Sequence, residues 1–124
     1  MTITATQVAN EPPVQHASGA YLDDASTPAA ATITLGFRPY YFHWLNATDR
    51  IGYEWYNGMA AGTTHKSVAA GTRTLDTGDA AITVNTSSVT VVHTALTQTV
   101  GGATVTIAAA AILQNKQNYW RAIG

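Results

Sequence analysis

The chain has 124 residues, enough for one domain with one modest hydrophobic core. Hydrophobic residues make up 46% of it, but charged residues only 10%, against about a quarter in typical proteins. So little charge suits a surface covered by neighbours in an assembly better than a free monomer. The formal net charge of −1 argues against nucleic acid or an anionic membrane as the partner.

Cysteine is absent, which excludes disulfides and thiolate metal sites. Residues 1–15 lack the basic start and the apolar run of a signal peptide. The longest apolar run, Ile107–Leu113, is too short to cross a bilayer. We therefore expect a soluble protein that is synthesised in the cytoplasm and has no membrane as a partner.

Residues 1–30 differ in composition from the rest, with three of the four prolines and a single aromatic residue, Tyr21. Such a segment buries little apolar area per residue, so we expect an extended N-terminal arm followed by one domain over residues 31–124. The alternation near Ile3 and Val8 would suit a strand added to the sheet edge of a neighbour.

The segment Leu35–Met59 holds eight of the eleven aromatic residues and predicts a β-hairpin. Its strands are Tyr40–Asn46 and Ile51–Asn57, joined by a polar four-residue loop. An alternating strand of residues 32–37 precedes it, and Pro39 interrupts the sheet pairing between them.

A four-residue loop fixes which residues of the hairpin face each other. Side chains alternate between the two faces of a strand, so one face carries a predicted core of four aromatic residues. These are Phe42, Trp44, Tyr53 and Trp55. The opposite face pairs Tyr41 with Tyr56 and brings His43 within hydrogen-bonding reach of Glu54. That face is too aromatic for ordinary solvent exposure, so we expect a partner to cover it.

The remaining elements are short. Residues 59–71 predict a loop with at most one strand. Four further strands are expected at Thr72–Leu75, Ala80–Asn85, Val89–Thr94 and Asn118–Ile123. A helical turn is expected within Ala108–Gln114. A second hairpin is expected over residues 95–108 around Gly101–Gly102, with one apolar face and one threonine face. About eight short strands predict an all-β, single β-sandwich or jelly-roll-like domain.

Residues for catalysis do not converge in the sequence. The four histidines lack metal-site spacing, and Asp76 and Asp79 fit an ordinary turn better than a calcium loop. His43 and Glu54 would suit an acid–base pair, but a structural cross-strand hydrogen bond is favoured because an enzyme needs more groups than one pair. We expect no enzyme activity, no cofactor and no metal.

The string GFRPYYFHWLNATDRIGYEWYNGM resembles a segment of small structural proteins of tailed bacteriophages. A GF-x-P start, an N-x-T-D-R turn, a Y-E-W strand and a following G-M carry the resemblance, which continues through Ala70–Leu75, Ala81–Val84 and the C-terminal YWRAIG. It implies a virion component, most like a capsid decoration (cement) protein of β-sandwich type.

The resemblance implies a location on the capsid surface, where the partners would be the major capsid protein of the same phage and neighbouring copies in a dimer or trimer. The alternative is a tail, fibre or head-fibre module that binds host-surface glycans through exposed aromatic residues. The expected interface residues are Ile3, Val8, Tyr21, Tyr41, His43, Glu54 and Tyr56.

Overall fold

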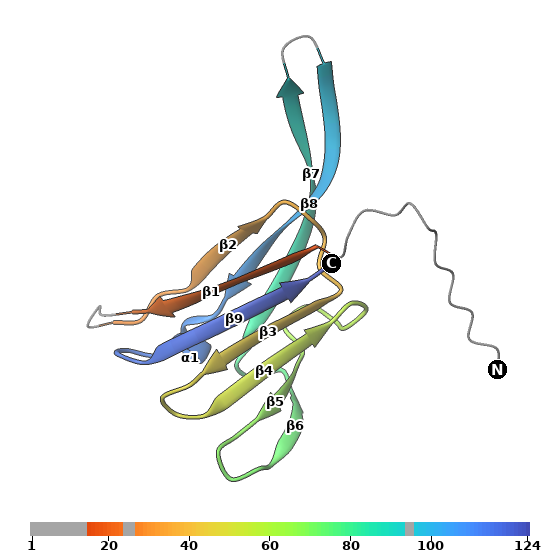
Figure 1. The fold of residues 1–124 in the computed structure, drawn as a ribbon. Helices are drawn as coiled ribbons and strands as arrows, with labels where there is room; N and C mark the ends of the chain where they lie inside the picture. Colours follow the sequence, from red (N-terminus) through yellow and green to blue (C-terminus); the bar gives the residue numbers. More distant parts are fainter. Residues whose placement is uncertain (1–14, 24–26, 94–95) are drawn as a thin grey trace, which may run out of the picture.

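The computed structural model describes residues 15–23, 27–93 and 96–124. This part of the chain is all-β, with two antiparallel sheets that face each other and one short helix (Figure 1). The elements are β1 (His16–Leu22), β2 (Ala31–Leu35), β3 (Tyr41–Asn46), β4 (Ile51–Tyr56), β5 (Thr64–Ser67), β6 (Arg73–Asp76), β7 (Ile82–His93), β8 (Leu96–Ile107), α1 (Ala109–Ile112) and β9 (Gln117–Ile123). The predicted all-β, sandwich-like class is confirmed.

The larger sheet has six strands in the order β1-β9-β3-β4-β5-β6, and the smaller has the order β2-β8-β7. In Figure 1 the larger sheet lies in front, and the smaller sheet lies behind it together with α1. The last strand, β9, therefore sits between β1 and β3, which joins the two ends of the described chain inside one sheet.

The aromatic hairpin forms as predicted, with Phe42 opposite Trp55, Trp44 opposite Tyr53 and Asn46 opposite Ile51. Its four-residue loop is held by the Asn46 side chain, which accepts a hydrogen bond from the Asp49 N–H at 3.0 Å. The Asn46 amide also donates to the Asp49 carboxylate at 3.1 Å. Because asparagine competes with backbone partners in this way, it favours a tight turn at this point.

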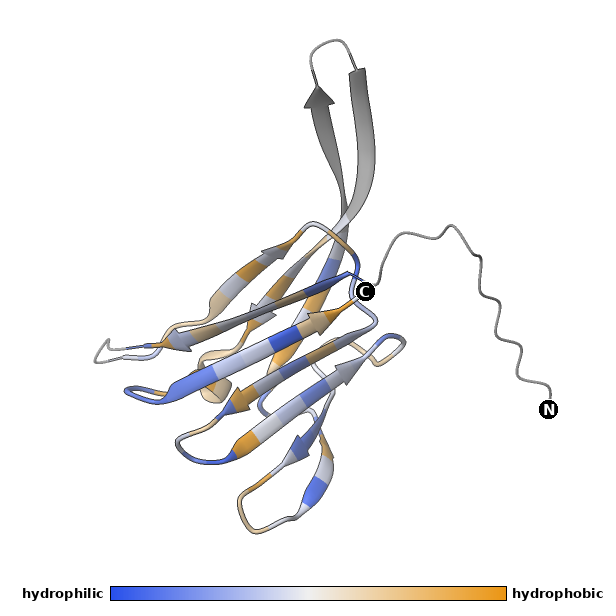
Figure 2. Ribbon diagram, in the orientation of Figure 1, coloured by the Kyte–Doolittle hydropathy of each residue, from blue (hydrophilic) through white to orange (hydrophobic). Residues whose placement is uncertain are grey.

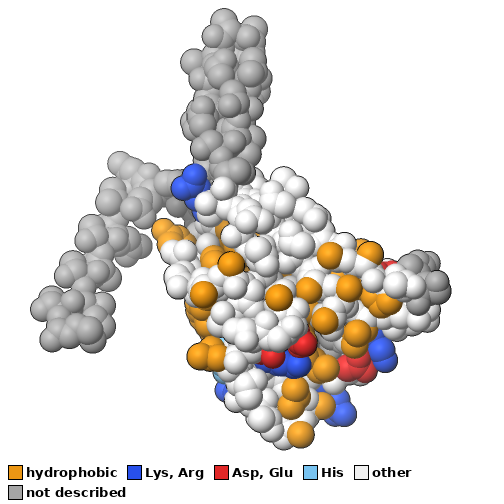
Figure 3. Space-filling view, turned by 180° about the vertical axis from the view of Figure 1, so that it is seen from behind, with side chains coloured by type: hydrophobic (Ala, Val, Ile, Leu, Met, Phe, Trp, Pro, Cys, Tyr) orange, Lys and Arg blue, Asp and Glu red, His pale blue; other side chains and the backbone are white. Residues whose placement is uncertain are grey.

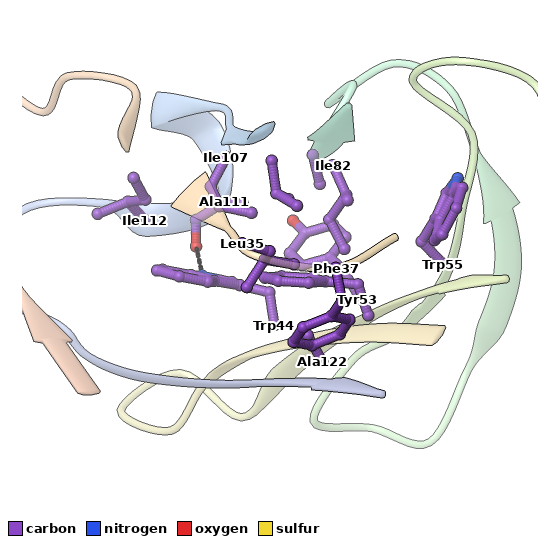
Figure 4. Packing of buried hydrophobic residues seen from close by; sticks show 13 residues of the cluster. Leu35, Phe37, Trp44, Tyr53, Trp55, Ile82, Ile107, Ala111, Ile112 and Ala122 are labelled. Atoms are coloured by element: carbon purple, nitrogen blue, oxygen red, sulfur yellow. Dashed lines mark hydrogen bonds between the residues drawn. The ribbon is translucent and has the colours of Figure 1, made fainter. Parts of the chain in front are cut away.

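The four aromatic residues predicted for the core are all buried, and Phe42 and Trp44 have no exposed surface. They pack against residues from the smaller sheet and α1, as Figure 4 shows for the labelled part of the cluster. The cluster consists of Leu35, Phe37, Phe42, Trp44, Tyr53, Trp55, Ala81, Ile82, Val105, Ile107, Ala111, Ile112 and Ala122. Hydrophilic and hydrophobic residues accordingly alternate along the strands in Figure 2, as expected for sheets with one buried face.

A polar network crosses this core. The Trp44 Nε1–H lies 3.1 Å from the Asn118 Oδ1 and 3.3 Å from the carbonyl oxygen of Ala111. The Asn118 amide in turn donates to the carbonyl oxygens of Ile112 and Lys116. These bonds attach α1 and the start of β9 to the centre of the larger sheet, and they satisfy polar groups that would otherwise be costly to bury.

The predicted second hairpin around Gly101–Gly102 is wrong. Both glycines lie inside β8, which pairs along its whole length with β7, and His93 opposite Leu96 puts the reversal at residues 94–95, outside the described residues. The two strands predicted at 80–85 and 89–94 are one strand. A glycine pair supplies a turn only where the flanking strands pair with each other, and here the longer β7–β8 pairing prevails.

Part of the threonine face predicted for this region is present, and it extends across all three strands of the smaller sheet. Thr106 lies between Thr32 of β2 and Thr83 of β7, and Thr104 lies between Thr34 and Asn85. Seen from behind, this surface of the smaller sheet is largely uncharged (Figure 3).

The structure differs from the predicted arm at residues 16–22, which form β1 and pair with β9 from His16–Ile123 to Leu22–Gln117. Its local sequence is poor in β-branched residues, so the strand depends on this long-range pairing. Ile3 and Val8 lie outside the described residues. The strands predicted at 72–75 and 118–123, the single strand within 59–71 and the helical turn correspond to β6, β9, β5 and α1.

Candidate functional site: the outer face of the larger sheet

The side of the six-stranded sheet that points away from the core is here called the outer face. Three cross-strand rows of side chains cover it. The central row consists of Ser18, Arg121, His43, Glu54, His65 and Leu75, in strand order. One flanking row is Ala20, Tyr119, Leu45, Gly52, Ser67 and Arg73, and the other is His16, Ile123, Tyr41 and Tyr56.

An aromatic and charged cluster occupies the middle of this face. The rings of Tyr41 and Tyr56 meet edge-on with centroids 5.3 Å apart, and the Arg121 guanidinium lies 5.7 Å from the Tyr41 ring centroid. The Tyr56 hydroxyl donates a hydrogen bond of 2.7 Å to the Glu54 carboxylate. These contacts hold the side chains in place while Tyr56 stays 46% exposed.

The predicted His43–Glu54 pairing of backbones is present, but Glu54 accepts its hydrogen bond from Tyr56 instead of His43. The His43 imidazole leans over Gly52, where a Cβ atom would lie 3.4 Å from its Nε2. The longer reach of the tyrosine hydroxyl along the same strand explains the exchange of partner.

Burial and neighbouring charges shift the pKa values of this cluster. Partial burial lowers the pKa of His43, an effect that Glu54 opposes and Arg121 reinforces. Partial burial also raises the pKa of Tyr41, although a hydrogen bond with Arg121 acts against it. The hydrogen bond to Glu54 raises the pKa of Tyr56. At neutral pH the lowered pKa keeps the His43 imidazole neutral, and the raised pKa values keep the Tyr41 and Tyr56 phenols neutral.

The structure brings together four of the predicted interface residues, namely Tyr41, His43, Glu54 and Tyr56. Tyr21 lies on the opposite face, where it pairs with Asn118 and its ring centroid is 6.3 Å from that of Trp44. Sequence reasoning missed Arg121 and Tyr119, which β9 contributes. The alternation in QNYWRAI could have identified them as one face of a strand, but not the strand beside which they lie.

A cleft of about 400 Å³ opens at one end of the sandwich, between the β2–β3 connection, the end of β4 and β7. Trp55 lines it, and the ring of Tyr40 at its border is 66% exposed. Arg38 and Asn57 supply polar groups at the same place. Aromatic surface next to such groups suits a small polar ligand.

The Asp76–Asp79 segment is a turn, as predicted. The Asp79 N–H donates to the Asp76 carboxylate, while the Asp79 carboxylate accepts from the Tyr53 hydroxyl at 2.8 Å and from Lys66 Nζ at 2.7 Å. The hydrogen bond from Lys66, followed by that from Tyr53, lowers the pKa of Asp79. Both contacts fasten this turn to β4 and β5.

Within the described ranges no group of three or more His, Cys, Asp or Glu side chains is placed to hold a metal ion. In the same part of the chain no helix has the length and hydrophobicity to cross a membrane. The outer face presents groups that suit recognition, namely aromatic rings, one cation and one carboxylate. No family model, curated protein or solved structure matches the chain.

Proposed function

We propose that this protein decorates the outside of a bacteriophage head, where it joins neighbouring capsid subunits and stabilises the shell through protein–protein contacts. The proposal rests on the resemblance of residues 36–59 to phage structural proteins, on the low charge of the chain and on its sandwich-like architecture. The protein would be made in the host cytoplasm and would reach the virion by assembly. We also propose that the strands of the sandwich are connected as in a jelly roll.

The outer face is the observation that carries this proposal. Tyr56 and Tyr119 are 46% and 48% exposed, and Leu75 is 71% exposed, all on one sheet face. Large aromatic side chains that are ordered by their neighbours and still face solvent are typical of protein interfaces, because they bury much area at little cost in side-chain entropy. A shell repeats such a contact by symmetry, so that modest individual affinities add up.

A second feature suits contact with a shell. Among the described residues, β2 pairs with residues 103–107 of β8 and no third strand pairs with the remainder of β7 and β8, which form a two-stranded ribbon. In Figure 1 this ribbon extends away from the two sheets. Its backbone could reach a neighbouring subunit while the outer face remains free for another contact.

The cleft beside Tyr40 favours a second candidate, a tail, fibre or head-fibre module that binds host glycans. An exposed aromatic ring next to Arg38 and Asn57 could stack on a sugar and hydrogen-bond its hydroxyl groups. A glycan array with wild-type protein and a Tyr40→Ala variant tests this function. Binding that the variant loses would support the glycan function.

The decoration function is tested by binding of the purified chain to phage heads that lack it. We expect saturable binding to heads, with a fixed number of copies per capsomer, and no binding to isolated tails. Decorated heads should also release DNA at a higher temperature than bare heads. Binding to tails alone would contradict the decoration function and favour the second candidate.

A further inference from the structure

We propose that the outer face docks onto the outer face of a second copy of the chain, around a two-fold axis that runs along β3. This inference names the partner of the outer face and rests on the proposed role of that face as an association surface. The position of charges on the central row, the exposed Tyr119 on a flanking row and the space beside Arg121 support it.

The central row places opposite charges at equal distances from β3. His43 lies on β3, Arg121 is its neighbour on β9, and Glu54 is its neighbour on β4. A two-fold axis along β3 exchanges the two sides of the row between the copies. Arg121 of each copy then faces the partner's Glu54, which gives two ion pairs from one symmetric contact.

The other in-plane orientation of the axis is unfavourable. An axis that runs across the strands would place each β9 over the partner's β9 and each β4 over the partner's β4. When such an axis passes through the central row, Arg121 faces Arg121 of the second copy, and Glu54 faces Glu54 of the second copy. Like charges brought together at an interface repel, so the charge pattern favours the axis along β3.

The flanking row adds an aromatic contact to this charge pattern. Tyr119 on β9 and Gly52 on β4 lie on either side of Leu45, so the same axis places the exposed Tyr119 ring over Gly52 of the second copy. Gly52 itself is buried, because the His43 and Leu45 side chains lie beside the position that a Cβ atom would take. Each Tyr119 ring would therefore rest on these two side chains of the second copy.

Space is also present for the ion pairs. A depression of about 310 Å³ lies between β3 and β9, and His43, Leu45, Tyr119 and Arg121 line it. The axis along β3 directs the partner's Glu54 toward this depression, beside the Arg121 guanidinium. The carboxylate can keep its Tyr56 hydrogen bond, because each oxygen accepts more than one donor.

The contact is of moderate size. Five adjacent strands of the sheet, β1, β9, β3, β4 and β5, take part. At about 4.8 Å per strand and about 20 Å along each strand, the footprint is roughly 500 Å². Stable complexes usually bury about 800 Å² per partner. We therefore expect a dimer that dissociates at micromolar concentration and is reinforced by the symmetry of the shell.

Reversal of the charge at Arg121 or at Glu54 tests the proposed dimer. Sedimentation equilibrium of the full-length chain should show a concentration-dependent dimer. Arg121→Glu and Glu54→Arg should each weaken it at least about tenfold, because like charges then meet. An equimolar mixture of the two variants should dimerise again, since each then finds its opposite charge. Arg73→Glu, on the same face but on β6 outside the footprint, is the matched control and should dimerise like the wild type.

Three results would overturn the proposal: a wild-type chain that stays monomeric at all concentrations, single variants that dimerise normally, or a mixture that stays monomeric. If Glu54→Arg does not fold, Tyr119→Ala replaces it and should weaken the dimer while the fold persists. Binding to heads is measured separately. A monomeric chain that still binds heads would contradict the dimer alone, and a dimer that binds no heads would contradict the decoration function alone.

Discussion

The indole of Trp120 lies across the backbone of Gly19: a Cβ atom at Gly19 would be 2.6 Å from the Trp120 Nε1. The same indole stacks on Phe42 with ring centroids 5.8 Å apart and an interplanar angle of 8°. One aromatic side chain thus links β1, β9 and β3 on the buried side of the larger sheet. Any side chain at Gly19 would force it out of this stack.

Gly19→Val should therefore destabilise the protein by about 1–3 kcal/mol, the usual cost of overpacking. Thermal and urea melts measure the loss. Ser18→Val is the matched control, because Ser18 lies on the outer face opposite Arg121 and should change stability by less than about 0.5 kcal/mol. Equal losses for the two variants would contradict the packing of Trp120 over β1.

The buried amide of Asn118 should contribute to the stability of the fold about as much as a large core side chain does. Asn118→Ala removes the nearer of the two acceptors of the Trp44 N–H and takes the side-chain donor away from the carbonyl oxygens of Ile112 and Lys116. We expect a loss of about 1–3 kcal/mol in the free energy of unfolding, because unsatisfied buried polar groups keep their full desolvation cost. A double-mutant cycle with Trp44→Phe should show strong coupling, and additive effects would contradict the network.

Removal of the Thr64 hydroxyl should stabilise the folded protein. Thr64 is fully buried, and its Oγ1 has no hydrogen-bond partner among the described residues. Thr64→Val keeps the shape and removes the unpaired hydroxyl, so it should raise the free energy of unfolding by about 1 kcal/mol. Thr63→Val, one residue earlier and only partly buried, is the control. A destabilised Thr64→Val protein would show that the hydroxyl has a partner in solution.

Stability should fall on mild acidification because burial lowers the pKa of His43 in the folded protein. The unfolded chain then binds the proton more readily than the folded one, so protonation favours unfolding. The contribution of His43 is constant above its ordinary pKa of about 6.5 and is lost progressively as the pH falls through the lower folded value. His43→Gln should flatten the decrease of the melting temperature between about pH 7 and pH 5. An unchanged slope would contradict this role.

A second loss of folding stability should follow at lower pH, when Asp79 is protonated. The hydrogen bond from Lys66 depresses the pKa of Asp79, so the carboxylate stabilises the folded state above its ordinary pKa of about 3.9, and that stability disappears as the pH falls through the depressed value.

The hairpin of β3 and β4 could be predicted because all the information is local. A polar four-residue loop and strict alternation fix the register, and with it the split between the Trp44 side and the Tyr41 side. The hairpin of β7 and β8 could not be predicted, because residues 94–95 carry no turn signal and Gly101–Gly102 does. Glycine inside a strand is tolerated when a longer pairing compensates its entropy cost.

Only the part of the candidate site that lies within one hairpin could be predicted, because only that part depends on local sequence. Tyr41, His43, Glu54 and Tyr56 share a face within one hairpin, so alternation identifies them. Arg121 joins them because β9 pairs with β3, and β9 lies more than seventy residues later in the chain. No local pattern specifies such a pairing, since it is decided by which strands together bury Trp120 and Ala122.

The most direct test of the decoration function is the position of this chain in particles of the phage that encodes it, seen by cryo-electron microscopy. We expect density of the size of one sandwich, repeated by symmetry on the outside of the head and absent from heads assembled without the protein. Density on the tail alone, or intact virions that contain no copy of the chain, would contradict it.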